Sequence, residues 1–163
     1  MKVAILSDAP DNIWKLGELL EDVGHLRAEV LLFCGDLCAP FTLRQIGEEF
    51  GGPVHVVQGN NDGDVFFLTR IANGLSNVTW HGLFAYLELG GRKVAINHYP
   101  QIARDQALSG LYDLVCHGHD HTANVESHGK ALLVNPGEVM GRFGKSTYAL
   151  YDTESGYAEL REV

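Results

Sequence analysis

Residues with metal-binding side chains follow five short apolar runs of this chain. The runs are Val3–Leu6, Val30–Phe33, Val54–Val57, Val94–Ile96 and Leu114–Cys116, and each predicts a buried strand. The residues that follow them are Asp8, Gly35-Asp36, Gly59-Asn60-Asn61-Asp62, Asn97-His98 and His117-Gly118-His119-Asp120-His121. Because groups just past the strand ends of an α/β sheet gather along one edge, we expect these side chains to meet. Oxygen and nitrogen donors without a thiolate suit divalent Mn, Fe, Zn, Ni or Mg.

Each of these residues, taken alone, also has an ordinary structural explanation. An Asp after a strand commonly caps a helix or forms a turn, and Gly-Asp and Asn-Asp pairs are common turn formers. His98 and His117 also fit as strand-end histidines with satisfied rings. The prediction of a metal site therefore depends on the coincidence of ligand-type residues at five successive strand ends.

The rest of the pattern predicts helices and further strands around these five. Apolar spacing, Pro40 and the stops at glycine predict helices over 13–23, 40–50, 64–72 and 100–108. Strand-like segments cover 78–80, 83–89, 92–96, 125–127, 131–134, 147–151 and 157–161, with a tight hairpin at Gly90-Gly91. A β-α-β-α-β start implies parallel strands with right-handed crossovers. The simplest architecture is α/β, with two sheets, helices outside, and residues 1–163 as a single domain.

The composition disfavours several classes of function. The chain of 163 residues is 45% hydrophobic and has a net charge of −9 without a Lys/Arg run, which disfavours binding to a nucleic-acid polymer. Three cysteines cannot all pair, so we expect reduced thiols and a cytoplasmic protein. No signal peptide is recognised, and no apolar run approaches the ~18 residues of a membrane span. A homo-oligomer is compatible with the sequence.

The ordered set of motifs resembles the calcineurin-like metallophosphoesterases, in particular their small single-domain phosphodiesterase branch. That family's pattern is D-x-H, GD, GN-(H/C)-D, a lone His after a strand, and GH-x-H. This chain has Ser7-Asp8-Ala9-Pro10, Gly35-Asp36, Gly59-Asn60-Asn61-Asp62, Asn97-His98 and Gly118-His119-Asp120-His121 in that order. Asn135-Pro136-Gly137 also resembles a turn of the small branch. The resemblance covers essentially the whole chain and implies a four-layer α-β-β-α sandwich of two mixed sheets flanked by helices.

The resemblance also implies two divalent metal ions that share Asp36 as a bridge. One would bind Asp8, Asp36 and His121, and the other Asp36, Asn60, His98 and His119. Two cations about 3.5–4 Å apart clamp a phosphate and convert a shared water into hydroxide, which would attack phosphorus in line. Mn²⁺ is the cation to test first, with Ni²⁺, Fe²⁺ and Zn²⁺ as alternatives.

Three positions depart from the family pattern. Pro10 stands where the family has a metal-binding His, so we expect weaker metal binding beside Asp8 and His121; Asp11 is a candidate replacement ligand. Asn61 replaces the His or Cys that assists the leaving group in larger relatives, so good leaving groups should be favoured. Asp120 replaces a Thr and either orients a neighbouring ring or faces water.

The function implied by the resemblance is hydrolysis of a small phosphodiester, such as a cyclic nucleotide or a nucleotide-derived ester. Asn60 is the main catalytic candidate, with Asn61 and Asp62 as further candidates, and Asn12 is a candidate for substrate binding. Two alternatives remain open. The fold also resembles the retromer subunit that uses a degenerate metallophosphoesterase scaffold to bind proteins, and a third option is a protein with only one metal.

Overall fold

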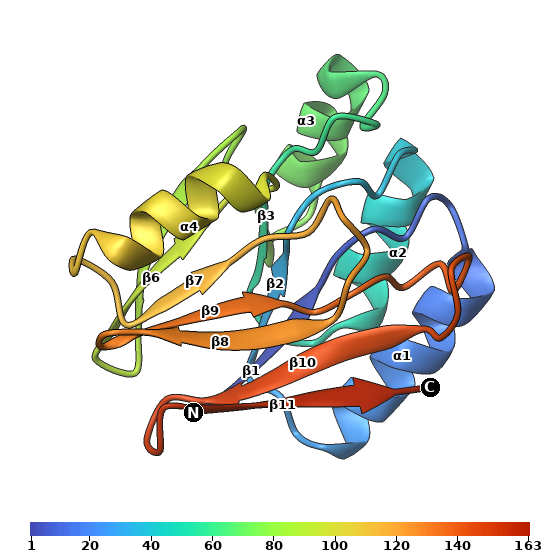
Figure 1. The fold of residues 1–163 in the computed structure, drawn as a ribbon. Coiled ribbons are helices and arrows are strands. Elements are labelled where there is room, and N and C mark those ends of the chain that lie inside the picture. The colour runs from blue at the N-terminus through green and yellow to red at the C-terminus, as the bar shows by residue number, and fades with distance from the viewer.

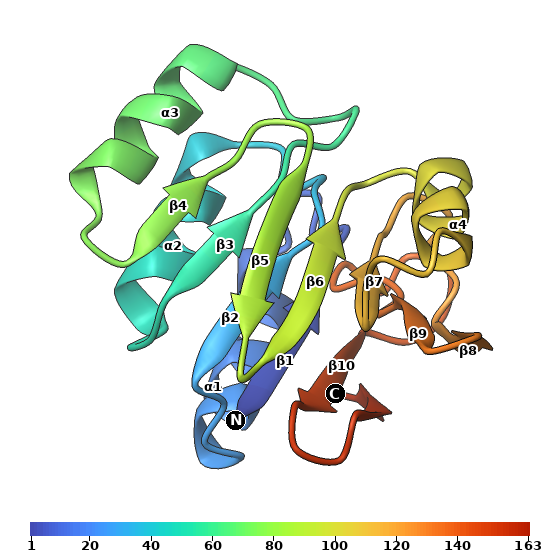
Figure 2. The same cartoon turned by 90° about the vertical axis from the view of Figure 1, so that its left-hand side faces the viewer.

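The computed structural model describes residues 1–163 and contains two β-sheets (Figures 1 and 2). The first has the order β11-β10-β1-β2-β3-β4 and the second β5-β6-β7-β9-β8. The strands are β1 (Lys2–Leu6), β2 (Val30–Phe33), β3 (Val54–Val56), β4 (Val78–Trp80), β5 (Ala85–Leu89), β6 (Arg92–Ile96), β7 (Leu114–Cys116), β8 (Asn124–His128), β9 (Ala131–Asn135), β10 (Thr147–Asp152) and β11 (Tyr157–Glu162). Both sheets are mixed: β1 to β4 are parallel, as are β6, β7 and β9, and the other pairings are antiparallel.

Helices cover the outer face of each sheet, which confirms the predicted four-layer sandwich. The helices are α1 (Ile13–His25), α2 (Pro40–Glu49), α3 (Val65–Gly74) and α4 (Pro100–Leu108). The first three pack on the first sheet and α4 packs on the second (Figure 2). Their starts follow from the sequence: the Asn12 and Asp64 side chains cap α1 and α3, and Pro40 and Pro100 open α2 and α4.

The central strands read as unbroken apolar runs because both of their faces are buried. Along β1, Ala4 and Leu6 pack against the helices, whereas Val3 and Ile5 pack into the core between the two sheets. Alternate residues of a strand point to opposite faces, so a strand covered on both sides needs apolar residues throughout. This layering holds in place the strands whose ends carry the predicted ligand residues.

Several predicted strands differ from the structure by one or two residues at their ends. The segment predicted over 83–89 begins at Ala85, because Gly82 has a positive φ of 73° and Leu83 and Phe84 remain exposed in the preceding turn. The third strand ends one residue earlier, at Val56. The hairpin at Gly90-Gly91 is confirmed: both residues have positive φ, and Leu89 pairs with Arg92.

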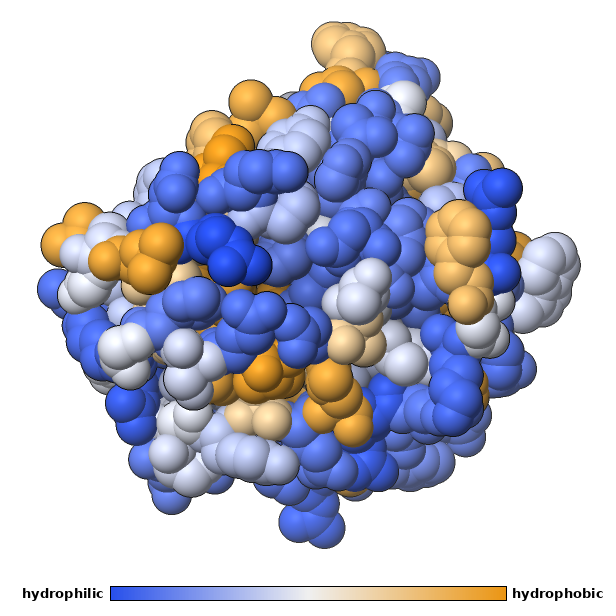
Figure 3. Space-filling model, viewed as in Figure 1, coloured by the Kyte–Doolittle hydropathy of each residue, from blue (hydrophilic) through white to orange (hydrophobic).

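The parallel strands of both sheets end at the same edge of the molecule, and the loops after β1, β2, β3, β6, β7 and β9 meet there (Figure 1). On the face of the molecule seen in Figure 1, hydrophilic residues predominate and apolar ones form separate groups (Figure 3). None of the helices has the length and apolar character needed to cross a membrane.

The His55–His81 pair predicts a pH-dependent stability. His55 Nδ1 and His81 Nε2 lie 3.0 Å apart, and burial lowers the pKa of both rings from the ordinary value of 6.5. The folded protein therefore favours the neutral form of both rings. Their contribution to stability is complete above pH 6.5 and is lost as the pH falls below it. We expect the melting temperature to fall between about pH 7.5 and about pH 5.5, and His81→Asn to reduce that fall. Thermal melts of both proteins at several pH values test this, and equal pH dependence would contradict it.

Candidate metal centre

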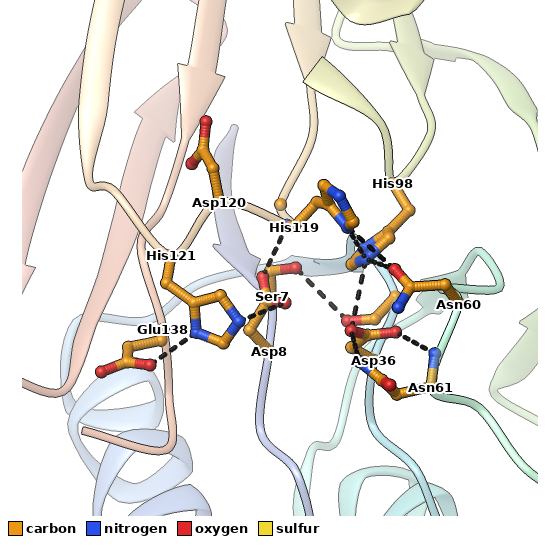
Figure 4. Close-up of polar contacts among 12 residues, drawn as sticks. Ser7, Asp8, Asp36, Asn60, Asn61, His98, His119, Asp120, His121 and Glu138 are labelled. Carbon is orange, nitrogen blue, oxygen red and sulfur yellow. Dashed lines mark hydrogen bonds and ion pairs between the residues drawn. The ribbon is translucent and has the colours of Figure 1, made fainter. Parts of the chain in front are cut away.

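Four of the predicted ligands form one half of a polar cluster at the strand ends (Figure 4). Asp36 follows β2, Asn60 follows β3, His98 follows β6 and His119 follows β7. His98 Nε2 lies 3.3 Å from Asp36 Oδ2 and 3.0 Å from Asn60 Oδ1. His119 Nδ1 lies 2.8 Å from Asn60 Oδ1 and 3.3 Å from His98 Nε2. The structure thus brings together four side chains from four different loops.

The other half of the cluster contains Asp8 and His121. His121 Nε2 lies 3.5 Å from Asp8 Oδ1, and Asp8 Oδ2 accepts a hydrogen bond from the backbone N–H of His119. Asp8 Oδ1 is buried without any hydrogen-bond partner. Burial raises the pKa of this carboxyl group, because loss of water disfavours the charged form. A nearby positive charge would compensate for that loss.

Both halves meet at the buried carboxylates. Asp8, Asp36 and His98 offer ligand atoms that all lie within 4.8 Å of one another, which is compatible with a bound divalent cation. The unpartnered Asp8 Oδ1 and the donor set of carboxylate, amide and imidazole both fit divalent metal ions.

The imidazole tautomers also fit metal binding. His98 Nδ1 lies 2.7 Å from the carbonyl oxygen of Cys34, and His121 Nδ1 lies 2.6 Å from Glu138 Oε2. Since both partners are acceptors, each Nδ1–H donates, and each Nε2 lone pair faces a carboxylate. A divalent cation held by these residues would compensate the carboxylate charge and accept the Nε2 lone pair. Without one, burial disfavours a charged His98, but the Asp36 carboxylate raises the ring's pKa overall, and His98 in turn lowers the pKa of Asp36.

Four of the predicted ligand residues have an unusual backbone conformation. Asp8, Asp36, His119 and His121 have φ values of 55°, 59°, 78° and 58°. This left-handed region is uncommon for residues other than glycine and costs about 1–3 kcal/mol each where the residue is strained. Hydrogen bonds of the surrounding loops hold these residues in place, which turns the side chains sharply out of the strand direction and into the cluster.

Two glycines allow the loops to approach closely. A Cβ atom on Gly59 would collide with the Asp36 carboxylate, and one on Gly118 would collide with the Ser7 hydroxyl and the Asp8 carboxylate. Only a residue without a side chain fits these positions. Gly59 and Gly118 are therefore required for the close packing of the loops that carry the predicted ligands.

Asp62 and Asn61 position the Asp36 carboxylate. Asp62 Oδ2 accepts from the backbone N–H of Gly59 at 2.7 Å and of Asp36 at 3.2 Å, and its Oδ1 accepts from Cys38 N–H. Asn61 donates to Asp36 twice, from its backbone N–H at 2.8 Å and its side-chain Nδ2 at 2.6 Å. Both residues orient the predicted bridging carboxylate, and their catalytic roles stay predictions.

Two candidates at the start of α1 have structural contacts. Asp11 Oδ1 accepts from Ala39 N–H and Thr42 Oγ1 at the start of α2, and its role as a replacement ligand stays a prediction. Asn12 accepts from Lys15 N–H as the cap of α1 and donates to the carbonyl of Met140. The prediction that Asn12 binds substrate gains no support from these contacts.

Asp120 points away from the cluster, between the two inward-facing histidines of its loop (Figure 4). Its Oδ1 accepts from Asn135 Nδ2 at 2.5 Å and from Thr122 N–H at 3.1 Å. The side chain is exposed, so of the two alternatives the structure favours the one in which Asp120 faces water.

Sequence reasoning missed Glu138. This residue is only 2% exposed and lies three positions after the end of β9, beyond the Asn135-Pro136-Gly137 turn. Besides accepting from His121 Nδ1, it accepts from the backbone N–H of Phe143 at 2.6 Å. The rule used for the other strands, which looks for acidic residues just past a strand end, would have found it.

The fold and the donor set define a class of proteins: two-sheet α/β proteins with a divalent metal site at the strand ends. The chain belongs to the calcineurin-like phosphoesterase superfamily, whose domain model matches residues 1–156. This family implies divalent metal ions, and the arrangement of Asp8, Asp36 and His98 agrees with that.

Known relatives support the assignment. The chain is 30% identical over 166 residues to Phosphodiesterase MJ0936 of Methanocaldococcus jannaschii, covering 100% of this chain and 98% of the relative. A solved archaeal phosphodiesterase shares 26% identity over the whole of both chains, with a TM-score of 0.93. Vps29 from Entamoeba histolytica, solved in complex with Zn²⁺, shares the fold at 16% identity, covering 100% and 98% of the chains with a TM-score of 0.69.

Proposed function

We propose that this protein is a metal-dependent phosphodiesterase that hydrolyses small phosphodiesters at a dinuclear centre. The observation that supports this most directly is the orientation of His98 and His121, whose Nε2 atoms both face buried carboxylates while their Nδ1 atoms are fixed by other acceptors. One metal would be held by Asp8, Asp36 and His121, and the other by Asp36, Asn60, His98 and His119.

The chain's own residues orient and neutralise the reacting groups. Divalent cations, when bound, supply positive charge to the phosphoryl oxygens and make water a better nucleophile. Asp36 lies between the two ligand sets and is held by two hydrogen bonds from Asn61. Since Asn61 is a neutral amide, it cannot transfer a proton to the leaving group as an acid. We therefore propose a preference for esters with good leaving groups.

The test of this function is hydrolysis of bis-p-nitrophenyl phosphate by metal-stripped protein, resupplied in turn with Mn²⁺, Ni²⁺, Fe²⁺ and Zn²⁺. We propose Mn²⁺ as the best activator because its preference for oxygen and imidazole ligands matches the donor set. Metal-dependent turnover supports the proposal, and no turnover with any metal by folded protein would contradict it.

The absence of a ligand at Pro10 favours one alternative, a protein-binding scaffold. The likeness to Vps29 agrees with that alternative at the level of the fold alone. Since that relative was itself solved with Zn²⁺, metal binding does not separate the two functions, but turnover does. Six of the seven expected ligands are present and clustered, and the relative with the highest structural similarity among those above is a phosphodiesterase, which favours the enzyme.

Replacing Pro10 by histidine is expected to strengthen metal binding beside Asp8 and His121. Pro10 lines the same hollow as His121, so an imidazole there adds a nitrogen ligand of the kind that the family uses. We expect Mn²⁺ affinity at the weaker site to rise by about tenfold, which corresponds to about 1.4 kcal/mol, and turnover to rise with it. Calorimetric titration of Pro10→His against Pro10→Ala measures the effect of the ligand apart from the loss of proline. Equal affinity in both variants would show that position 10 does not face the metal.

A cytoplasmic location and a substrate no larger than a nucleotide-sized diester complete the proposal. The support is the three cysteines, which are all free, and the negative charge of the chain, which disfavours a polymeric nucleic acid.

A further inference from the structure

A hollow of about 460 Å³ lies directly beside the proposed metal centre. It shares His121 and Asn61 with the centre, and its other walls include Pro10, Met140, Arg142 and Phe143. We name it the Phe143 groove. Its volume is within the range of about 300–1,000 Å³ that small organic ligands occupy. A phosphate held by the metal ligands would therefore have room for one of its organic groups in this groove.

The groove combines apolar walls with one arginine that forms no ion pair. Pro10, Met140 and Phe143 are apolar, and the Phe143 side chain is 69% exposed. The Arg142 guanidinium lies over the Phe143 ring in a cation–π contact, 5.0 Å from its centre, and forms no ion pair with any carboxylate of the chain. In a chain with a net charge of −9, an unpaired arginine beside a phosphate site is suited to an anionic ligand.

Loop 138–146, which contains Phe143, is fixed to the metal ligands. Glu138 accepts from His121 Nδ1 with one oxygen and from Phe143 N–H with the other, both at 2.6 Å. Met140 N–H donates to the carbonyl of Asp8 at 3.1 Å. The Phe143 ring meets the His121 ring edge-on, with the centroids 5.3 Å apart. The aromatic face of Phe143 is thus placed at a fixed position relative to the metal centre.

We propose that the Phe143 groove selects phosphoesters with a planar aromatic group, an aryl ring or a nucleobase, which stacks on Phe143 while Arg142 pairs with the phosphate. This inference rests on the proposed function, because the phosphate must be held by the metal centre. Planar groups gain from offset stacking on an exposed phenyl ring beyond the burial of apolar area, and an alkyl ester lacks this gain.

Binding of two monoesters to the Mn²⁺-loaded protein tests the groove independently of turnover. Phenyl phosphate and methyl phosphate have the same charge and differ in the aromatic ring. By calorimetry we expect wild type to bind phenyl phosphate about fivefold to tenfold more tightly. Phe143→Ala should remove this preference, and Phe143→Tyr should keep it. Phe66→Ala, which removes a similarly exposed phenylalanine from α3, should leave the preference unchanged.

The role of Arg142 gives a second, separable readout. Arg142→Gln should weaken both esters alike, by about threefold to fivefold, and leave the ratio of the two affinities unchanged. Equal binding of the two esters by wild type, or an unchanged ratio in Phe143→Ala, overturns the groove assignment even if diesters are hydrolysed. Selective binding of phenyl phosphate without diester hydrolysis would support the groove and contradict the proposed reaction.

Discussion

Replacing Asp36 by asparagine is expected to lower metal-dependent hydrolysis of bis-p-nitrophenyl phosphate by at least about a thousandfold, or about 4 kcal/mol of transition-state stabilisation. The substitution keeps the size of the side chain but removes the charge shared by the two proposed metal sites. It also disturbs the contact with Asn61, because both Asp36 oxygens accept from that residue and an amide offers only one acceptor. The measurement is kcat with saturating Mn²⁺, together with metal content.

The variant should remain folded, since asparagine tolerates the left-handed conformation that Asp36 adopts, with φ at 59°. Circular dichroism and the melting temperature check this. Asp120→Asn is the matched control: it removes a carboxylate from the histidine loop, but one that is exposed and points away from the cluster (Figure 4). We expect its turnover to stay within about twofold of wild type. Similar losses in both variants would mean that general charge, rather than the bridge position, controls activity.

The sequence predicted the sheets well because their central strands are buried on both faces. Runs such as Val30–Phe33 and Leu114–Cys116 are fully buried, so the apolar pattern directly reflects the packing. Prediction was less accurate where exposure changed within a run, as at Leu83 and Phe84, whose apolar character does not correspond to burial. The convergence of ligand residues followed from topology alone, since the loops after parallel strands meet at one edge.

The orientation of individual side chains could not be predicted in the same way. His119, Asp120 and His121 are neighbours in sequence, yet the positive φ values of the two histidines turn them toward the cluster while Asp120 points outward. Asn12 and Asp11 lie next to the site but use their polar atoms for helix starts. Local backbone conformation and hydrogen-bond competition decide these cases, and residue type alone does not distinguish a helix cap from a ligand-binding side chain.

Replacing Glu138 by glutamine should weaken metal binding at the proposed Asp8–His121 site and leave the other proposed site nearly unchanged. Glu138 accepts from His121 Nδ1 and from Phe143 N–H; a glutamine amide has one acceptor oxygen and must fail one of them. If its NH₂ faces His121, the ring is driven to the tautomer that places hydrogen on Nε2, which then cannot bind a cation. We expect Mn²⁺ affinity at the Asp8–His121 site to fall by about 10–100-fold, measured by calorimetric titration of metal-stripped protein.

The control for this substitution is Glu126→Gln, which alters another glutamate–histidine pair, with His128 at 3.0 Å, on β8. It should leave both Mn²⁺ affinities unchanged. If the glutamine oxygen faces His121 instead, the Phe143 contact is the one that is lost, and Glu138→Gln should then reduce the preference for phenyl phosphate rather than the metal affinity. Metal affinity and ester preference therefore both depend on the Glu138 carboxylate. A Glu138→Gln variant that keeps both would show that neither His121 nor Phe143 depends on Glu138. The backbone of their own loops would then set the positions of these two residues.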